Sequence, residues 1–114
     1  MIISVTGLKP RGFISFIRFW FLAVPSFRQA QSARGNLFCQ TRSHNGYQHT
    51  LTAWKDRKSM KHYVLSGAHR KAMGQFHKLA TGATITFESD TVPDWNEALA
   101  KWQKEAEFYQ TKLE

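Results

Sequence analysis

An Asn-Gly pair near the middle of the chain, Asn45-Gly46, constrains the fold more than any other feature of this sequence. Both residue types tolerate a positive φ, which the two-residue turn of a β-hairpin requires. Runs rich in aromatic residues and threonine lie on either side, from Leu37 to Arg42 and from Tyr47 to Trp54. The sequence therefore predicts two antiparallel strands joined through residues 43–46.

Two further strands are predicted on either side of this hairpin. Ile2–Thr6 is rich in β-branched residues and is followed by Gly7 and a Lys-Pro-Arg-Gly turn, which predicts a strand that ends at Gly7. Residues 83–88 alternate between apolar and polar side chains, which is the pattern of a strand with one buried face. Both strands can join the hairpin in one sheet.

A strongly apolar segment lies between the first strand and the hairpin. Several of its side chains recur at the spacing of one helix face: Phe13, Phe16, Ile17, Trp20, Phe21 and Val24. We expect this face to pack in the core, with Phe19 and Leu22 on a second face that a partner subunit could cover. The segment is short and interrupted by Arg18, so stable membrane insertion is not expected. Pro25 should kink or end the helix, and Ser26 should cap a short second piece.

Helical patterns also follow the hairpin. Asp56 can cap a helix that Ser66-Gly67 interrupts, and a second segment then runs to about Leu79. Near the end of the chain, Pro93-Asp94 and Glu97 form a start similar to a capping box, and apolar residues keep helical spacing beyond it. We expect this last helix to dock on the core.

The predicted order is strand, helix, strand, strand, helix, strand, helix, in a single domain that spans residues 1–114. This order is typical of the α+β class and of its ferredoxin-like β-α-β-β-α-β arrangement, here with an appended C-terminal helix and an antiparallel four-stranded sheet. Helices are expected on one face of the sheet, so its other face would stay open. A homodimer formed through that open face would complete the fold.

Charge and cysteine content bear on partners and compartment. The formal net charge is +8, from 16 Lys and Arg against 8 Asp and Glu. A basic protein can bind nucleic acid or another anionic partner. The aromatic-rich strand motif of RNA-binding modules with this topology is absent, which does not favour nucleic acid. Cys39 is the only cysteine, so no internal disulfide can form, and we expect a cytoplasmic protein.

Three segments resemble a known group of proteins: Leu51–Asp56, Met60–Tyr63 and Ser66–Met73. They are similar to the strand-to-helix core of the dimeric α+β-barrel superfamily, which includes the antibiotic-biosynthesis monooxygenases. Arg28-Gln29-Ala30 ahead of Gly35-Asn36-Leu37 resembles the spheroidene-monooxygenase-like branch and its small uncharacterised relatives. The resemblance implies a dimeric α+β barrel with a ligand cavity between the sheet and the helices.

The haem-degrading members of that superfamily use an Asn on the first strand, a Trp in the second helical region and a His further along it. Here Ser4 or Thr6, Tyr63 and Met73 stand at those positions. The set of residues for haem degradation is therefore absent, while haem binding through another residue stays open.

His69 is the candidate catalytic residue. It shares an apolar stripe with Met73, Phe76 and Ala80, which places it on a helix face turned to the sheet. A neutral imidazole can ligate haem iron or accept a proton, because its unperturbed pKa is about 6.5. The alternative is a buried histidine that bonds a backbone carbonyl. The expected ligand-binding side chains are Phe16, Trp20, His49, Tyr63, Met73 and Phe76.

His49 lies in the middle of its predicted strand, on the same face as Tyr47 and Leu51 and opposite Trp54. Its side chain could point into the cavity or into a dimer interface. No metal site is expected, because no cluster of histidines, cysteines or carboxylates has ligand spacing.

Two functions stay open from the sequence. The first is a small monooxygenase-like enzyme, or a haem-binding protein, that acts on a hydrophobic small molecule in the cavity. The second is a non-catalytic binding module whose basic face takes an anionic partner such as nucleic acid. Motifs of hydrolases, kinases and dehydrogenases are absent, and the residues do not decide whether the protein is catalytic.

Overall fold

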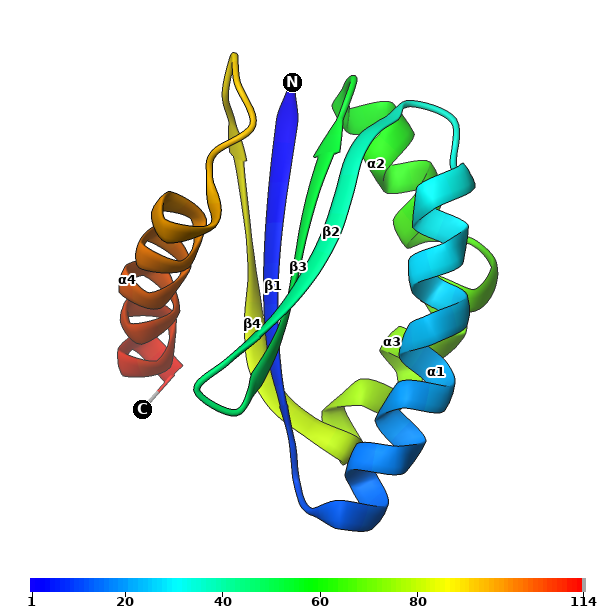
Figure 1. The fold of residues 1–114 in the computed structure, drawn as a ribbon, viewed down its shortest axis with the longest axis vertical. Coiled ribbons are helices and arrows are strands. Elements are labelled where there is room, and N and C mark those ends of the chain that lie inside the picture. The colour runs from blue at the N-terminus through cyan, green and yellow to red at the C-terminus, as the bar shows by residue number, and fades with distance from the viewer. Residues whose placement is uncertain (114) are drawn as a thin grey trace.

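The computed structural model describes residues 1–113, without the side chains of residues 68, 73, 74, 76–78 and 107–113. Along the described chain, strands and helices follow one another in the order shown in Figure 1: β1 Ile2–Pro10, α1 Phe13–Ser32, β2 Asn36–His44, β3 Tyr47–Trp54, α2 Arg57–Val64, α3 Gly67–Leu79, β4 Ala80–Glu88 and α4 Trp95–Leu113. The predicted order is confirmed, including the break between α2 and α3.

The hairpin turn has the predicted geometry. Asn45 and Gly46 have φ values of 50° and 81°, which are the two positive angles of a type I′ turn. β2 and β3 pair antiparallel on either side of this turn, with His44 opposite Tyr47.

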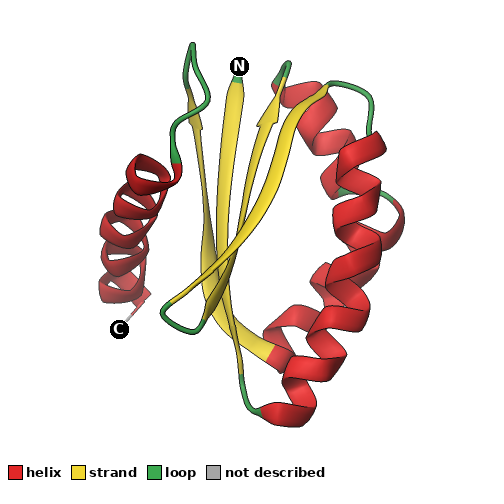
Figure 2. Ribbon diagram, in the orientation of Figure 1, coloured by secondary structure: helices red, strands yellow, loops and turns green. Residues whose placement is uncertain are grey.

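The strands form one antiparallel sheet in the order β2-β3-β1-β4. In the central part of the sheet, Val5 of β1 lies between Leu51 of β3 and Ile85 of β4. This order, with the helices between the strands, is the predicted ferredoxin-like arrangement (Figure 2).

β1 is longer than predicted, because Gly7 lies inside the strand instead of ending it. Gly7 pairs with His49 on β3 and with Ala83 on β4. A Cβ atom at this position would collide with the indole of Trp102 on α4 and with the ring of His49. The missing side chain therefore allows close helix-on-sheet packing, which a sequence pattern cannot distinguish from a turn.

α1 continues through Pro25, contrary to the predicted kink or end. A proline inside a helix removes the hydrogen bond to the carbonyl four residues earlier, which here belongs to Phe21. Both residues are exposed, so water can satisfy that carbonyl. Ser26, predicted as a cap, is buried within the helix and hydrogen-bonds Tyr63.

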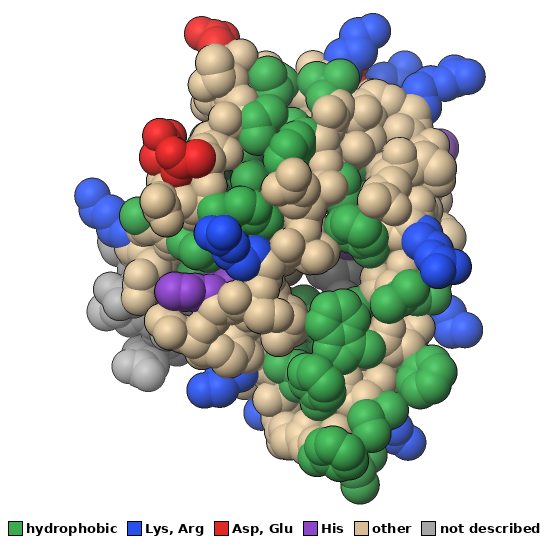
Figure 3. All heavy atoms as spheres, in the orientation of Figure 1, with side chains coloured by type: hydrophobic (Ala, Val, Ile, Leu, Met, Phe, Trp, Pro, Cys, Tyr) green, Lys and Arg blue, Asp and Glu red, His purple; other side chains and the backbone are tan. Residues whose placement is uncertain are grey.

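The apolar stripe of α1 that was predicted to pack in the core is the exposed one. Phe13 and Phe21 are 78% and 77% exposed, whereas Phe19, from the other face, is 4% exposed. The first half of α1 is apolar nearly all round, so its periodicity could not select the inner face. The small side chains of Ser26 and Ala30 determine which face of α1 is buried, because they allow α1 to approach the sheet and α2. Figure 3 shows hydrophobic side chains gathered over α1.

The sheet is covered on both faces, so the prediction of an open face is wrong. α1, α2 and α3 lie on one side, and α4 lies on the other (Figure 1). Ala98, Trp102 and Ala106 of α4 pack on a cluster of sheet residues: Ile3, Val5, Leu51, Ala53 and Ile85. The expected homodimer stays a prediction, but it cannot form through an open sheet face in this arrangement.

No helix in the described part of the chain is both long enough and apolar enough to cross a membrane.

Candidate functional site

A cavity of about 1060 Å³ lies between the sheet and the layer formed by α1, α2 and α3. The molecular surface is hollowed between the sheet and α1 (Figure 3). A volume of this size is at the upper end of the range of small-molecule sites. The helices thus cover this face of the sheet but leave a ligand-sized space between the two layers.

Hydroxyl groups line the sheet side of the cavity and form what we call the hydroxyl floor: Ser4, Thr6, Thr50, Thr52, Thr84 and Thr86. The register places them in two rows across the three strands. Ser4 is opposite both Thr52 and Thr86, and Thr6 is opposite both Thr50 and Thr84. The hydroxyl floor is therefore polar, unlike the apolar face that a sheet usually presents to helices.

Only part of the hydroxyl floor is used by the protein itself. The hydroxyls of Thr6 and Thr84 are 3.0 Å apart, and Thr52 accepts a hydrogen bond from the indole nitrogen of Trp54 at 3.1 Å. Hydroxyls can both donate and accept, so this surface suits a ligand that carries oxygen atoms.

Apolar side chains of α1 line the opposite side of the cavity: Phe19, Trp20, Ala23, Val24 and Phe27. Phe19 and Trp20 meet edge to face, with ring centroids 5.7 Å apart. A ligand between the two sides would bury apolar surface against α1 and meet hydroxyls on the strands.

His69 lines the cavity near the start of α3. Its Nδ1 lies 3.2 Å from the carbonyl oxygen of Val64. Val64 is the last residue of α2, so its carbonyl accepts no hydrogen bond within that helix. A carbonyl can only accept, so Nδ1 carries the proton and Nε2 keeps a free lone pair. Burial lowers the pKa of His69, and the ring is therefore neutral near pH 7.

Gln29 of α1 holds the segment that carries His69. Its Nε2 donates to the carbonyl of Ser66 at 2.9 Å, and its Oε1 accepts from the backbone N–H of His69 at 2.8 Å. The break between α2 and α3 is thus fixed to α1 by one side chain, which positions the imidazole.

Tyr63 packs beside His69, with ring centroids 4.5 Å apart, and stacks on Trp54. Its hydroxyl donates to the backbone carbonyl of Ser26 at 3.1 Å. Burial raises the pKa of Tyr63 to about 12, so the phenol stays protonated. Tyr63 also borders the cavity, so it both lines the site and supports His69 and α1.

His49 does not join His69. It borders the cavity, but its ring packs toward α4, with its centroid 4.7 Å from that of Trp102 and 5.9 Å from that of Tyr47. Burial lowers the pKa of His49, and its Nδ1 is buried without a hydrogen-bond partner among the described residues. As alternation along β3 predicts, Trp54 lies on the other face.

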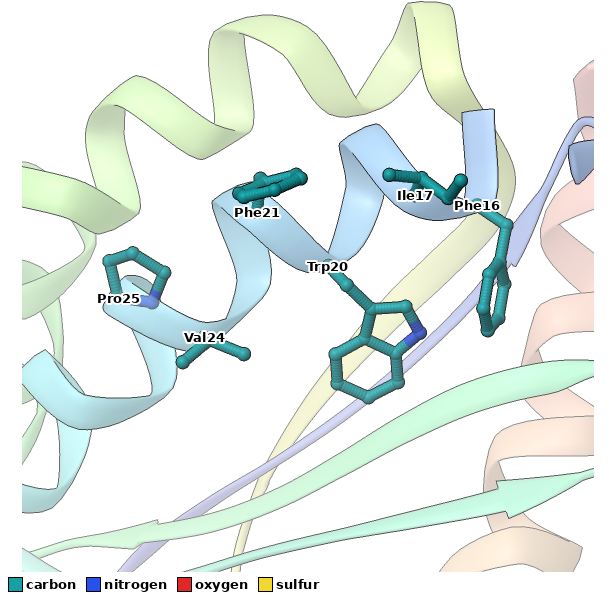
Figure 4. A pocket seen from close by; sticks show the side chains of 6 residues that line it. All are labelled: Phe16, Ile17, Trp20, Phe21, Val24 and Pro25. Atoms are coloured by element: carbon teal, nitrogen blue, oxygen red, sulfur yellow. The ribbon is translucent and has the colours of Figure 1, made fainter. Parts of the chain in front are cut away.

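The other residues predicted to bind the ligand lie in different places. Phe16 lines only an outer groove of about 510 Å³ on α1, whereas Trp20 borders both this groove and the cavity. Figure 4 shows the groove, formed by Phe16, Ile17, Trp20, Phe21, Val24 and Pro25. The side chains of Met73 and Phe76 lie outside those that the structure describes.

Nothing among the described residues forms a group of three or more possible metal ligands. Burial raises the pKa of the Cys39 thiol to about 11, so the thiolate needed for nucleophilic attack is scarce near pH 7.

The hydroxyl floor was not predicted from the sequence, although a signal existed. On each of three strands, two hydroxyl residues alternate with apolar ones: Ser4 and Thr6, Thr50 and Thr52, Thr84 and Thr86. Alternation alone assigns such residues to solvent, since it does not show which face the helices cover.

Neither a family model nor a curated protein matches this chain. Solved structures do match it. SnoaB, a cofactor-independent oxygenase from Streptomyces nogalater, has a TM-score of 0.65 at 11% identity, covering 82% of this chain and 97% of SnoaB. An antibiotic biosynthesis monooxygenase has a TM-score of 0.69 at 9% identity, covering 80% of this chain and all of the other.

A conserved protein from Methanosarcina mazei is similar to the same extent, with a TM-score of 0.67 at 12% identity over 79% of this chain and 94% of that one. The chain thus has the fold of antibiotic biosynthesis monooxygenase-like proteins, as the resemblance in its sequence predicts.

Proposed function

We propose that the cavity binds a flat, mostly apolar small molecule that carries oxygen atoms, and that His69 accepts a proton from one of its carbons so that the carbon reacts with O₂. The observation that carries this proposal is the state of the imidazole: Nδ1 is held by the Val64 carbonyl, and burial favours the neutral ring. A neutral Nε2 in a ligand-sized cavity can act as a general base. The fold of SnoaB, a cofactor-independent oxygenase, supports the same chemistry.

The proposed reaction converts a methylene to a carbonyl. His69 Nε2 takes one proton, and the carbanion transfers electrons to O₂ and forms a C–O bond to give a peroxide. The peroxide is then protonated, its O–O bond breaks, and the second C–H proton leaves as water is released. One oxygen atom stays on carbon and the other enters water, so the substrate supplies all the electrons.

The hydroxyl floor and α1 would orient such a substrate. Hydroxyls of Thr6 and Thr50 can donate to the oxygen that gains charge as the carbon loses its proton, which stabilises the carbanion. Phe19 and Trp20 would cover the opposite face and exclude water.

His69 could instead hold haem iron through Nε2, since histidines that ligate metals commonly donate their second ring N–H to a backbone carbonyl. Arg28 borders the cavity and could pair with a haem carboxylate. Bound haem would supply redox chemistry at iron. We favour the oxygenase without haem. The face of a porphyrin ring is apolar, whereas the hydroxyl floor would place polar groups against it.

Oxygen uptake with anthrone, a tricyclic ketone with an acidic methylene, tests the proposal. We expect the wild-type protein to accelerate uptake over buffer and His69→Asn to lose about a hundredfold of this rate. His62→Asn, on the exposed face of α2, is the matched control and should keep the rate. A His69→Asn protein that remains folded and is as fast as wild type contradicts the role of His69.

Titration with haem separates the second possibility. A Soret band that forms with wild-type protein and is lost in His69→Asn would establish haem ligation instead. Unchanged haem spectra in both proteins would remove it.

A further inference from the structure

The outward face of α1 carries a row of exposed apolar side chains, most of which lie outside the cavity. Phe13, Ile14 and Phe21 are the most exposed, and Ile17 and Val24 are each at least 40% exposed. Phe13, Ile14, Ile17 and Phe21 do not line the cavity. We call these five residues the α1 outer face. An apolar surface of this kind on a small protein marks a contact with something else.

The acidic side chains are concentrated in one part of the molecule, away from α1, α2 and α3. The helices beside the α1 outer face carry exposed cations: Arg18 and Arg28 on α1, Arg57, Lys58 and Lys61 on α2, and Arg70 and Lys71 on α3. Asp56 is the only acid before Glu88 in the chain. The other acids with described side chains follow on β4, the loop after it and α4, where Lys101 and Lys104 are also exposed. The acidic atoms visible in Figure 3 at the upper left lie on the side away from α1.

We infer that the α1 outer face binds the surface of an anionic phospholipid bilayer. α1 would lie in the plane of the interface, with its five apolar side chains among the acyl chains and Arg18 at the level of the phosphates. Cations of α2 and α3 would add long-range attraction to the anionic headgroups. Because no described helix can span a bilayer, binding would be peripheral and reversible.

Two other kinds of partner, a second copy of the chain and nucleic acid, would make less use of this surface. A second copy seated on the same face would bring two cationic helix layers together, with Asp56 as the only acid on each to compensate them. Nucleic acid would use the cations but leave Phe13, Ile14 and Phe21 in contact with charged phosphates. A bilayer surface is the partner that uses both the apolar row and the surrounding cations.

Co-sedimentation with vesicles tests this inference. We expect the wild-type protein to bind phosphatidylcholine vesicles that contain about one-third phosphatidylserine, to bind pure phosphatidylcholine much more weakly, and to dissociate as salt rises. Phe13→Ser combined with Phe21→Ser should reduce the affinity at least about tenfold. Arg18→Gln should reduce it about fivefold.

The matched control is Leu37→Ser, since Leu37 is 57% exposed but lies on β2 and should bind as wild type does. Far-UV circular dichroism confirms that each variant is folded. Absence of wild-type binding to anionic vesicles overturns the inference, and so does equal binding of the double variant. If the wild-type protein does not bind vesicles but is a dimer in light scattering, and Phe21→Ser is a monomer, the α1 outer face binds a second copy instead. Salt-sensitive RNA binding without vesicle binding would assign the cations to nucleic acid.

This test is independent of the cavity chemistry. Phe13, Phe21 and Arg18 lie outside the cavity lining, so their variants should oxidise anthrone as wild type does. Loss of vesicle binding with intact oxidation, or the reverse, shows which of the two proposals fails.

Discussion

Nδ1 of His69 lies 3.2 Å from the carbonyl oxygen of Val64, so the end of α2 and the imidazole on α3 satisfy each other. The break at Ser66-Gly67 makes this contact possible, because it frees the Val64 carbonyl and turns α3 back toward it. The hydrogen bond selects one tautomer of the ring and leaves Nε2 as the reactive nitrogen.

Removal of the Gln29 side chain should loosen this arrangement. In Gln29→Ala, the N–H of His69 and the carbonyl of Ser66 both lose a partner, and we expect a loss of about 1–3 kcal/mol in the free energy of unfolding. Urea denaturation measures it. Gln31→Ala, two residues later on α1 where the side chain is exposed, is the control and should change stability by less than about 0.5 kcal/mol. Equal losses in both variants would mean that Gln29 has no positioning role.

The stability of the protein should fall in mild acid because of His69 and His49. Burial lowers both pKa values from 6.5, so as the pH falls the unfolded chain binds protons before the folded one does. Acid therefore favours unfolding below pH 6.5 and has no effect through these groups above it. Urea midpoints between about pH 7.5 and pH 5 should show this slope, and His69→Asn should make it shallower. An unchanged slope would show that His69 titrates alike in both states, and His62→Asn serves as the control.

Gly7→Ala should destabilise the protein through α4. The added Cβ would meet the indole of Trp102 and the ring of His49, and we expect a loss of about 1–3 kcal/mol. Combining it with Trp102→Leu, which makes room, should cost less than the sum of the two single changes. Additive losses in this double-mutant cycle would place the cost in the strand itself.

The hydroxyl floor should serve ligand binding more than folding. Thr6→Val with Thr84→Val removes both partners of the 3.0 Å hydrogen bond and should change the free energy of unfolding by less than about 1 kcal/mol. The rate of anthrone oxidation should fall in the same variant, because the cavity loses donors to the substrate oxygen. Thermal melts and oxygen uptake measure the two effects. A large loss of stability with unchanged oxidation would make the floor a structural feature only.

The elements of this fold follow from local sequence, because each depends on neighbours in the chain. Asn45-Gly46 specifies its turn through positive φ, and the carboxylate of Asp56 accepts the N–H of Ser59 at 2.8 Å to begin α2. Asp94 begins α4 in the same way with the N–H of Glu97. Such contacts span a few residues, so periodicity and capping patterns reveal them.

The candidate site was predicted in part. The stripe pattern selected His69, and the structure places it in the cavity. Its orientation depends on Gln29, which is 40 residues earlier in the chain. Phe16 was expected in this cavity but lines only the outer groove, and His49 borders the cavity while its ring packs toward α4. Periodicity does not show which side of a strand or helix meets a given neighbour.

The sequence by itself determined the order of strands and helices, the hairpin and the ferredoxin-like topology. Only the tertiary structure decided which faces are buried. The first half of α1 is apolar nearly all round, and the inner face of the helix was selected by the fit of Ser26 and Ala30 against α2 and the sheet. α4 closed the sheet face that was expected to stay open. The physical reason is that burial arises from contacts distant in sequence, whereas turns, caps and periodicity arise from contacts nearby.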